Sequence, residues 1–215
     1  MIGNKYFISV VTTLYKSAPF VHEFYTRMKG TLERLSASYE IVFVDDGSPD
    51  DSGTKVKGII SLDPCVKLVE LSRNFGHHQA VMAGLKESKG DRVFLIDIDL
   101  EEKPEWLVDF HNEMANGYYD AVFGYNKKRA GTWYNQISGS LFYYLFNIFS
   151  TTKISPNICT VRYMKRNYVD AVLTMGDKNV FMAGIFSWVG FKQYNKEVQK
   201  DRRDSATSYS LLKKV

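Results

Sequence analysis

The sequence lacks any run of about 18 consecutive apolar residues, the length that a membrane-spanning helix requires. It also lacks a secretory signal, because the apolar stretch from Tyr6 to Thr13 is short and is followed by no small-residue cleavage site. Only two cysteines occur, Cys65 and Cys159, and their spacing fits neither a metal cluster nor a disulfide framework. We therefore expect reduced core thiols in a cytosolic protein.

Excess charge is small and is confined to one end of the chain. The net charge of the 215 residues is +4, and residues 192–215 carry seven lysines and arginines against three acids, so the remainder is neutral. A local basic segment favours phosphate or an anionic membrane surface over general nucleic-acid binding, although a solvated basic tail would give the same pattern. The length is typical of one domain, and no internal repeat occurs.

Two carboxylates follow an apolar run near the middle of the chain. Val93–Ile96 predicts a buried strand of a parallel sheet, and Asp97 and Asp99 come directly after it. The carboxyl ends of such strands are where open α/β sheets bind ligands. Neighbouring carboxylates repel each other, and a divalent cation relieves that repulsion. The motif therefore indicates either a metal that carries a phosphorylated ligand or a solvated acidic loop.

Strands and helices are predicted to alternate over the first 125 residues. Apolar and β-branched runs predict strands at Phe7–Leu14, Glu40–Val44, Val66–Leu71, Val93–Ile96 and Ala121–Tyr125. Helical spacing predicts helices from Pro19 to about Ser36, from His77 to Gly90 and from Pro104 to Asn116. This order predicts β-α-β units and a parallel sheet, with the polar turns after the strands gathered at one edge.

The pattern changes after Tyr125. Residues 132–152 contain no charged residue, are rich in aromatic side chains and are flanked by lysine and arginine. Such a segment predicts an amphipathic helix lying in the membrane interface, with a buried core or dimer helix as the alternative. Beyond it the expected elements are helices at Arg166–Met175 and Val180–Trp188 and a strand at Phe191–Val198.

Six short motifs are spread from the first strand to the C-terminal tail. They are Ser9–Tyr15, Ile41–Ser48, Leu71–His78, Ala83–Leu85 with Gly90–Asp91, Trp188–Phe191 and Arg202–Tyr209. The first two resemble family 2 glycosyltransferases with the GT-A fold, and the others narrow the resemblance to polyprenyl-phosphate glycosyltransferases, such as dolichol-phosphate mannose synthases and their undecaprenyl-phosphate relatives. The resemblance covers Phe7 to about Leu212.

The resemblance implies a fold and assigns donor binding and acceptor binding to different parts of the chain. It implies an α/β, Rossmann-like, mostly parallel sheet flanked by helices, with an interfacial amphipathic helix. Residues 1–215 would form one catalytic domain. Residues 1–125 would bind the nucleotide sugar, and residues 126–215 would supply the acceptor and membrane half with a basic closing tail.

The same resemblance implies roles for individual residues. The nucleotide pocket would comprise Thr13, Leu14, Tyr15, Asp45, Asp46, Gly47, Ser48, Arg73 and Asn74, with Asp45 on the base. The ligands of Mg²⁺ or Mn²⁺ at the diphosphate would be Asp97, Asp99 and Glu101. The groups closing over phosphate would be Arg129, Arg202, Arg203 and Ser205, and the three arginines with Asp99 would be the catalytic groups.

The chain departs from the family pattern at three places. Thr13–Ser17 stands where Pro-x-Tyr-Asn-Glu is usual, Glu101–Lys103 replaces Gln-Asp-Pro, and Gly176–Asn179 stands where a Glu or Asp is common. Relatives often continue into two membrane-spanning helices after the segment matching Ser205–Tyr209, whereas this sequence stops at Val215. We therefore expect either a shortened chain or a member without that anchor.

The expected reaction is inverting transfer of a sugar from a nucleotide-diphosphate sugar to a polyprenyl phosphate at the cytoplasmic membrane face. A phosphate with a second pKa of ~6 is already anionic near neutral pH and needs no strong base. That agrees with a sequence that shows no evident Ser-His-Asp set. Residues 132–152 would contact the membrane; no nucleic-acid partner is expected, and a homo-oligomer stays open.

Two alternatives remain open from the residues. Transfer to a glycan hydroxyl would require a carboxylate base, for which the candidates are Glu101, Glu102 and Asp177. A nucleotide-binding protein without activity would release no nucleoside diphosphate. We also expect His77 and His78 at a helix start near phosphate rather than as metal ligands, and Trp188 in the core.

Overall fold

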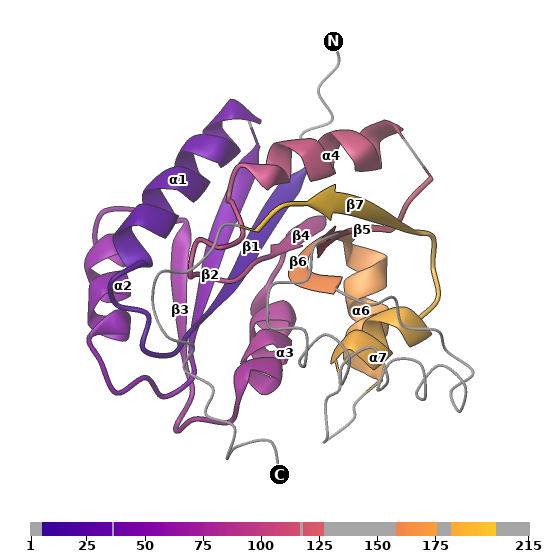
Figure 1. Cartoon of the computed structure of the whole chain (residues 1–215). Helices are drawn as coiled ribbons and strands as arrows, with labels where there is room; N and C mark the ends of the chain where they lie inside the picture. The colour runs from indigo at the N-terminus through magenta and orange to yellow at the C-terminus, as the bar shows by residue number, and fades with distance from the viewer. Residues whose placement is uncertain (1–5, 36, 117, 127–157, 176–181, 201–215) are drawn as a thin grey trace, which may run out of the picture.

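The computed structural model describes residues 6–35, 37–116, 118–126, 158–175 and 182–200. Within these residues a seven-stranded sheet has the order β3-β2-β1-β4-β6-β5-β7 (Figure 1). The strands are β1 Phe7–Leu14, β2 Ser38–Asp45, β3 Val66–Glu70, β4 Arg92–Leu95, β5 Ala121–Asn126, β6 Ile158–Lys165 and β7 Gln193–Val198. The helices are α1 Val21–Arg34, α2 Ser52–Ile60, α3 His77–Glu87, α4 Trp106–Asn116, α6 Arg166–Thr174 and α7 Met182–Trp188.

The predicted α/β fold with a mostly parallel sheet is confirmed. Strand β1 pairs in parallel with β2 and β4, β2 pairs in parallel with β3, and β5 pairs in parallel with β7. The exception is β6, which lies antiparallel between β4 and β5. Consequently the fifth predicted strand does not lie beside the fourth, although the chain meets them in succession.

Two elements in the described residues were not predicted. Helix α2, Ser52–Ile60, contains two glycines in nine residues, and glycine has a low helix propensity that hides the helix from the local pattern. Strand β6, Ile158–Lys165, carries Arg162 and Lys165 among its apolar residues. Helix α3 ends at Glu87, three residues before the predicted Gly90. The predicted interfacial helix at 132–152 lies outside the described residues.

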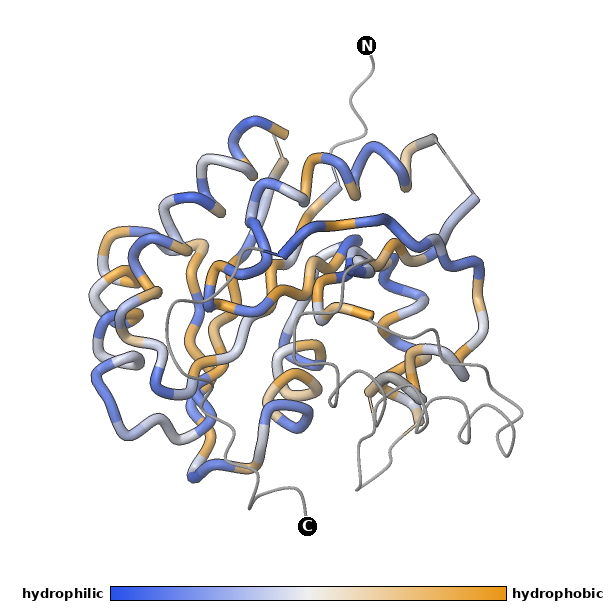
Figure 2. Tube along the Cα trace, viewed as in Figure 1, coloured by the Kyte–Doolittle hydropathy of each residue, from blue (hydrophilic) through white to orange (hydrophobic). Residues whose placement is uncertain are grey.

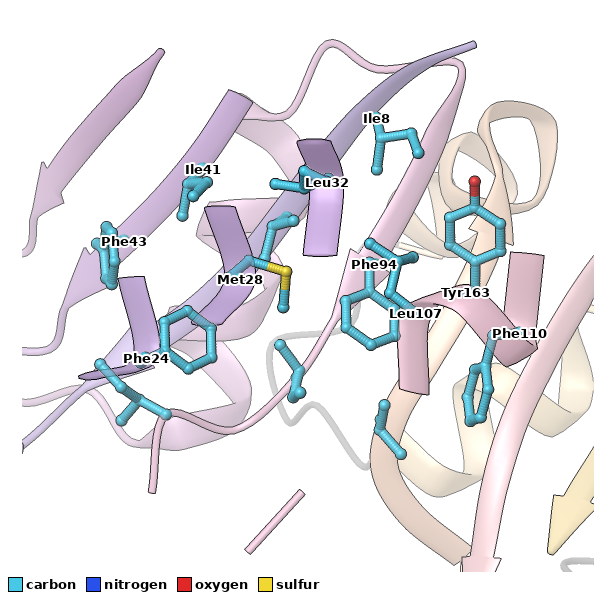
Figure 3. Close-up of a cluster of buried hydrophobic side chains, with 14 of the residues drawn as sticks. Ile8, Phe24, Met28, Leu32, Ile41, Phe43, Phe94, Leu107, Phe110 and Tyr163 are labelled. Atoms are coloured by element: carbon cyan, nitrogen blue, oxygen red, sulfur yellow. The ribbon is translucent and has the colours of Figure 1, made fainter. Parts of the chain in front are cut away.

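Helices cover both faces of the sheet and enclose a hydrophobic core on each. Helices α1, α2 and α4 pack on one face, where Phe24 lies 5.9 Å from Phe43 and Phe94 lies 6.1 Å from Phe110 between ring centroids (Figure 3). Helices α3, α6 and α7 pack on the other. Figure 2 shows that the central strands are mostly apolar, whereas the edge strand β7 is mostly hydrophilic.

Close packing of α3 on the sheet depends on Gly84. A Cβ atom at this position would lie 2.5 Å from Cγ1 of Val11 and 2.8 Å from Cγ2 of Val44. Glycine therefore lets the helix approach β1 and β2 directly, and it fixes where the first turn of α3 stands relative to the ends of these strands. No helix in the part of the chain that the structure describes is both long and apolar enough to span a membrane.

Candidate functional site

Four parallel strands, in the order β3-β2-β1-β4, end side by side, and the loops that follow them form the candidate site. Leu14 at the end of β1 is paired with Asp45 at the end of β2, and Leu95 at the end of β4 is paired with Val11 of β1. Parallel strands bring their carboxyl ends to the same edge of a sheet, where ligands bind. Hydrogen bonds between these loops confirm the predicted gathering of polar turns at one edge.

Asp46 holds two of the loops together. The residue is 2% exposed, and its carboxylate accepts hydrogen bonds from Nδ2 of Asn74 at 3.0 Å and from the backbone N–H groups of Phe75 at 2.7 Å and Gly76 at 3.0 Å. Its own backbone N–H donates to the carbonyl of Leu14 at 3.0 Å. Asp46 thus shapes the edge by joining the ends of β1 and β2 to the loop before α3.

The loop that contains Asp46, residues 45–48, packs closely against the loop before α3 through a glycine. Gly47 has φ +62°, and a Cβ there would lie 2.5 Å from the carbonyl carbon of Arg73. Asp45 is partly exposed, and its Oδ1 accepts from the backbone N–H of Ser48 at 2.7 Å. Burial raises the pKa of Asp45 despite this bond, and nearby acids raise it further. Asp45 is only partly exposed, and its second oxygen, Oδ2, lies toward Gly53 of α2, so a ligand would meet this carboxylate at a partly covered position.

The side chains of the remaining predicted pocket residues differ in their exposure to solvent. The guanidinium of Arg73 lies 4.0 Å from the ring centroid of Phe75, and both side chains face solvent. Tyr15 is 39% exposed. By contrast, the side chain of Leu14 is fully buried in the core, so this residue lends only its main chain to the edge.

His77 begins α3, as predicted, and bridges two of the loops. Its Nδ1 lies 3.1 Å from Oγ1 of Thr13, and its Nε2 lies 3.7 Å from Oδ1 of Asp97. Burial lowers the pKa of His77 against the opposing effect of nearby carboxylates, which favours the neutral ring near pH 7. A neutral imidazole has one donor and one acceptor nitrogen, and Nδ1 is within hydrogen-bond distance of Thr13, whereas the 3.7 Å from Nε2 to Asp97 is longer than a hydrogen bond.

The acidic motif forms a turn rather than a continued strand. Strand β4 ends at Leu95, and Leu100 adopts the left-handed conformation with φ +64°. Oδ1 of Asp99 accepts from the backbone N–H of Glu101 at 3.1 Å. Burial raises the pKa of Asp97, and the charges of Asp99 and Glu101 raise it further. The turn therefore concentrates negative charge that a cation would relieve.

Glu102 lies beneath this turn and is fully buried. Its Oε2 accepts from the backbone N–H of Asp97 at 3.3 Å, and its Oε1 accepts from the backbone N–H of Thr160 at 3.1 Å and pairs with Nζ of Lys200 at 2.9 Å. Burial and the charge of Asp97 raise the pKa of Glu102 to about 7, although Lys200 opposes the shift. A carboxylate with 0% exposure and both oxygens engaged cannot reach a substrate hydroxyl.

Sequence reasoning did not select Thr160 or Lys200 and considered Glu102 only as a base. A signal was available in the departure of Glu101–Lys103 from the usual family pattern, but nothing local showed which distant residues would face it. Five predicted or candidate residues lie outside the described part of the chain: Arg129, Asp177, Arg202, Arg203 and Ser205. Their roles stay predictions.

Two expectations about core residues need correction. Trp188 is 66% exposed, so its predicted place in the core is wrong. It is the last residue of the short helix α7, whose buried face is provided by Ile185 and Phe186 instead. Both cysteines are free, as predicted, but only Cys159 is buried, whereas Cys65 is partly exposed.

The donor set fits a metal that arrives with its ligand. The described residues contain no group of three or more His, Cys, Asp or Glu side chains arranged to hold a metal ion. They do bring Asp97 into electrostatic contact with both Asp99 and Glu101 on one turn, so the three predicted ligands lie near one another without forming a preformed metal site. Mg²⁺ is commonly held by one or two carboxylates together with substrate phosphates and water, and Asp97 and Asp99 suit that arrangement.

Comparison with known proteins agrees with this geometry. The family model described as Glycosyl transferase family 2 matches residues 9–173. A Mycobacterium tuberculosis protein named as a glycosyltransferase is 38% identical over 208 residues, covering 97% of this chain and 60% of the relative. The prophage bactoprenol glucosyl transferase homolog of Escherichia coli is 32% identical over 193 residues, covering 86% of this chain and 60% of the relative.

Solved structures share the fold. The mannosyltransferase PcManGT from Pyrobaculum calidifontis, solved in complex with GDP-Man and Mn²⁺, superposes with a TM-score of 0.63 at 19% identity and covers 90% of this chain and 55% of its own. The chain spans 60% of the length of the two relatives above. With the family model matching most of its length, the chain belongs to glycosyltransferase family 2.

Proposed function

We propose that this chain transfers a sugar from a nucleotide-diphosphate sugar to a polyprenyl phosphate with inversion at the anomeric carbon. The observation that carries the proposal is the convergence of the Asp97–Asp99 turn, the 45–48 loop and the 73–76 loop at one edge of the sheet. The bactoprenol glucosyl transferases among its relatives support the choice of acceptor.

Different described residues would bind the base and the phosphates of the donor. Asp45, partly exposed at the end of β2, would accept a hydrogen bond from the base, and the exposed guanidinium of Arg73 would face the phosphates. Asp46 would keep the two loops at a fixed separation through its three hydrogen bonds. In this proposal residues 1–125 bind the nucleotide sugar and residues 126–215 serve the acceptor.

The diphosphate would lie at the acidic turn. Asp97 and Asp99 would hold Mg²⁺ or Mn²⁺, and that ion would supply charge stabilisation for the nucleoside diphosphate as it leaves. The neutral ring of His77 would orient Thr13 and would lie beside Asp97. Arg129, Arg202 and Arg203 are proposed to add positive charge around the phosphates.

Acceptor chemistry favours a phosphate over a sugar hydroxyl. An acceptor phosphate oxygen forms the new bond to the anomeric carbon, while the bond from that carbon to the nucleoside diphosphate breaks. The phosphate is already deprotonated, whereas a hydroxyl must lose a proton to a base. Burial raises the pKa of Glu102 to about 7, but the side chain is buried and both its oxygens are engaged, so it cannot serve a hydroxyl.

The remaining parts of the proposal concern the membrane. Residues 132–152 would rest in the interface at the cytoplasmic face, where the polyprenyl carrier is held, and the basic residues beyond 192 would favour anionic headgroups. Both statements depend on sequence composition, since residues 127–157 and 201–215 lie outside the described part of the chain.

An acceptor comparison tests the proposal. The protein is incubated with Mn²⁺ and radiolabelled nucleotide sugars, and with either undecaprenyl phosphate in detergent or free oligosaccharides. We expect label in the lipid phase and an equal amount of nucleoside diphosphate in the aqueous phase. Transfer to oligosaccharide alone would contradict the lipid acceptor, and donor binding without transfer to any acceptor would contradict catalysis altogether.

A further inference from the structure

The buried ion pair between Glu102 and Lys200 is not explained by the proposed reaction. Glu102 is 0% exposed and Lys200 is 25% exposed, and their charged atoms lie 2.9 Å apart. Burying two charges costs free energy that their mutual attraction only partly offsets, so such a pair is a poor device for stability alone. Its position directly beneath Asp97 points to a role in the site.

We propose that Glu102 and Lys200 are positioning residues that prepare Asp97 for its cation. Glu102 would fix the main chain of Asp97 and neutralise Lys200, so that the lysine does not occupy the Asp97 carboxylate itself. The inference rests on the proposed function, because it assumes that Asp97 and Asp99 hold a divalent ion.

Geometry supports the positioning part of this role. Glu102 connects its own turn after β4, through Asp97, to two segments that are distant in sequence: the start of β6 through Thr160, and the residues directly after β7 through Lys200. The side chain of Thr160 also hydrogen-bonds Asp97. The main chain and the side chain of Asp97 are therefore both held by contacts that depend on the Glu102 pocket.

Charge supports the neutralising part. The ammonium of Lys200 lies 2.9 Å from Oε1 of Glu102, and Oε2 of the same carboxylate accepts from the backbone N–H of Asp97 at 3.3 Å, so the charge of Lys200 lies near Asp97 as well as Glu102. A cation this close competes with a metal ion for the same carboxylate. Glu102 supplies the matching negative charge from the protein side, which leaves Asp97 available to a ligand.

Mn²⁺ binding to the full chain, measured by the loss of the free-ion signal in electron paramagnetic resonance, tests this role without turnover. Glu102→Gln keeps the size of the side chain and removes its charge, so Lys200 is left to pair with Asp97. We expect this variant to bind Mn²⁺ about tenfold more weakly or worse. The double variant Glu102→Gln/Lys200→Met removes both charges and should recover to within about threefold of the wild type.

Recovery of Mn²⁺ affinity in the double variant distinguishes the proposed role of the ion pair from a role in packing alone. If the pair only packed the turn against the sheet, the double variant would bind Mn²⁺ no better than Glu102→Gln, and that result would overturn the inference. Wild-type affinity in Glu102→Gln would overturn it too. Should Glu102→Gln fail to fold, the double variant alone decides, because near wild-type Mn²⁺ affinity supports the inference and a large loss overturns it.

A control distinguishes this inference from the proposed function. Asp99→Ala should abolish specific Mn²⁺ binding if the acidic turn is the metal site. If Asp99→Ala binds Mn²⁺ as the wild type does, the metal site of the proposed function fails. If Asp99→Ala loses Mn²⁺ while Glu102→Gln retains it fully, only the role of the ion pair fails.

Discussion

Replacing Asp99 with alanine is expected to lower sugar transfer by about a thousandfold or more at every Mn²⁺ or Mg²⁺ concentration tested. The carboxylate would hold the ion that stabilises the departing diphosphate, and added metal cannot replace a missing ligand. The side chain lies on a partly exposed turn outside both hydrophobic cores, so the fold should stay intact. Release of nucleoside diphosphate gives the rate, and circular dichroism checks the fold.

Asp109→Ala provides the matched control for this experiment. Asp109 is an exposed acid on α4, away from the loops that form the edge, and its removal changes the net charge by the same amount. We expect activity close to that of the wild type. Full activity in Asp99→Ala, or an equal loss in both variants, would show that the acidic turn has no specific part in transfer.

Replacing Asp46 with alanine is expected to have the largest effect on stability among the residues of the edge. The change leaves three donors without their acceptor: Nδ2 of Asn74 and the backbone N–H groups of Phe75 and Gly76. Each buried donor left unpaired costs about 1–3 kcal/mol, and partial access to water reduces the sum. We expect the free energy of unfolding to fall by about 3 kcal/mol in a urea titration.

The same change should weaken donor binding. Loss of the Asp46 contacts releases the 74–76 loop from the end of β2, so the two halves of the nucleotide pocket no longer have a fixed separation. Calorimetric titration with the donor nucleotide should show at least about a tenfold rise in Kd. Asp46→Asn keeps the shape of the side chain but exchanges one acceptor oxygen for a donor. Its Kd for the donor nucleotide should lie between those of the wild type and Asp46→Ala. Unchanged stability in Asp46→Ala would mean that the loops are not joined through this carboxylate.

Much of the first half of the fold follows from local pattern. The run Phe7–Leu14 predicts β1 with the bounds that the structure has, because an uncharged run rich in β-branched residues specifies a buried central strand. The gathering of the Asp45–Asp46, Arg73–Asn74 and Asp97–Asp99 turns follows from the parallel order of the strands they terminate. Local information was sufficient here because each β-α-β unit is continuous in sequence.

The part that could not be predicted depends on long-range pairing. Strand β6 inserts between β4 and β5, although 31 residues outside the described part of the chain, 127–157, separate it from β5. That insertion brings Thr160 to Asp97. Lys200 follows β7, which pairs separately with β5, and it lies opposite Glu102, 98 residues earlier in the chain. No periodicity in the sequence encodes such a meeting, and the burial of Glu102 becomes evident only in three dimensions.

A crystal structure of the protein with Mn²⁺ and a nucleoside diphosphate tests the central claim most directly, because manganese is located independently by its anomalous scattering. We predict one manganese peak within about 2 Å of a carboxylate oxygen of Asp99 or Asp97, with diphosphate oxygens completing its coordination and the base near Asp45. A nucleotide bound at another face of the sheet, or bound at this edge with manganese coordinated elsewhere, would contradict the assignment of the acidic turn as the diphosphate site.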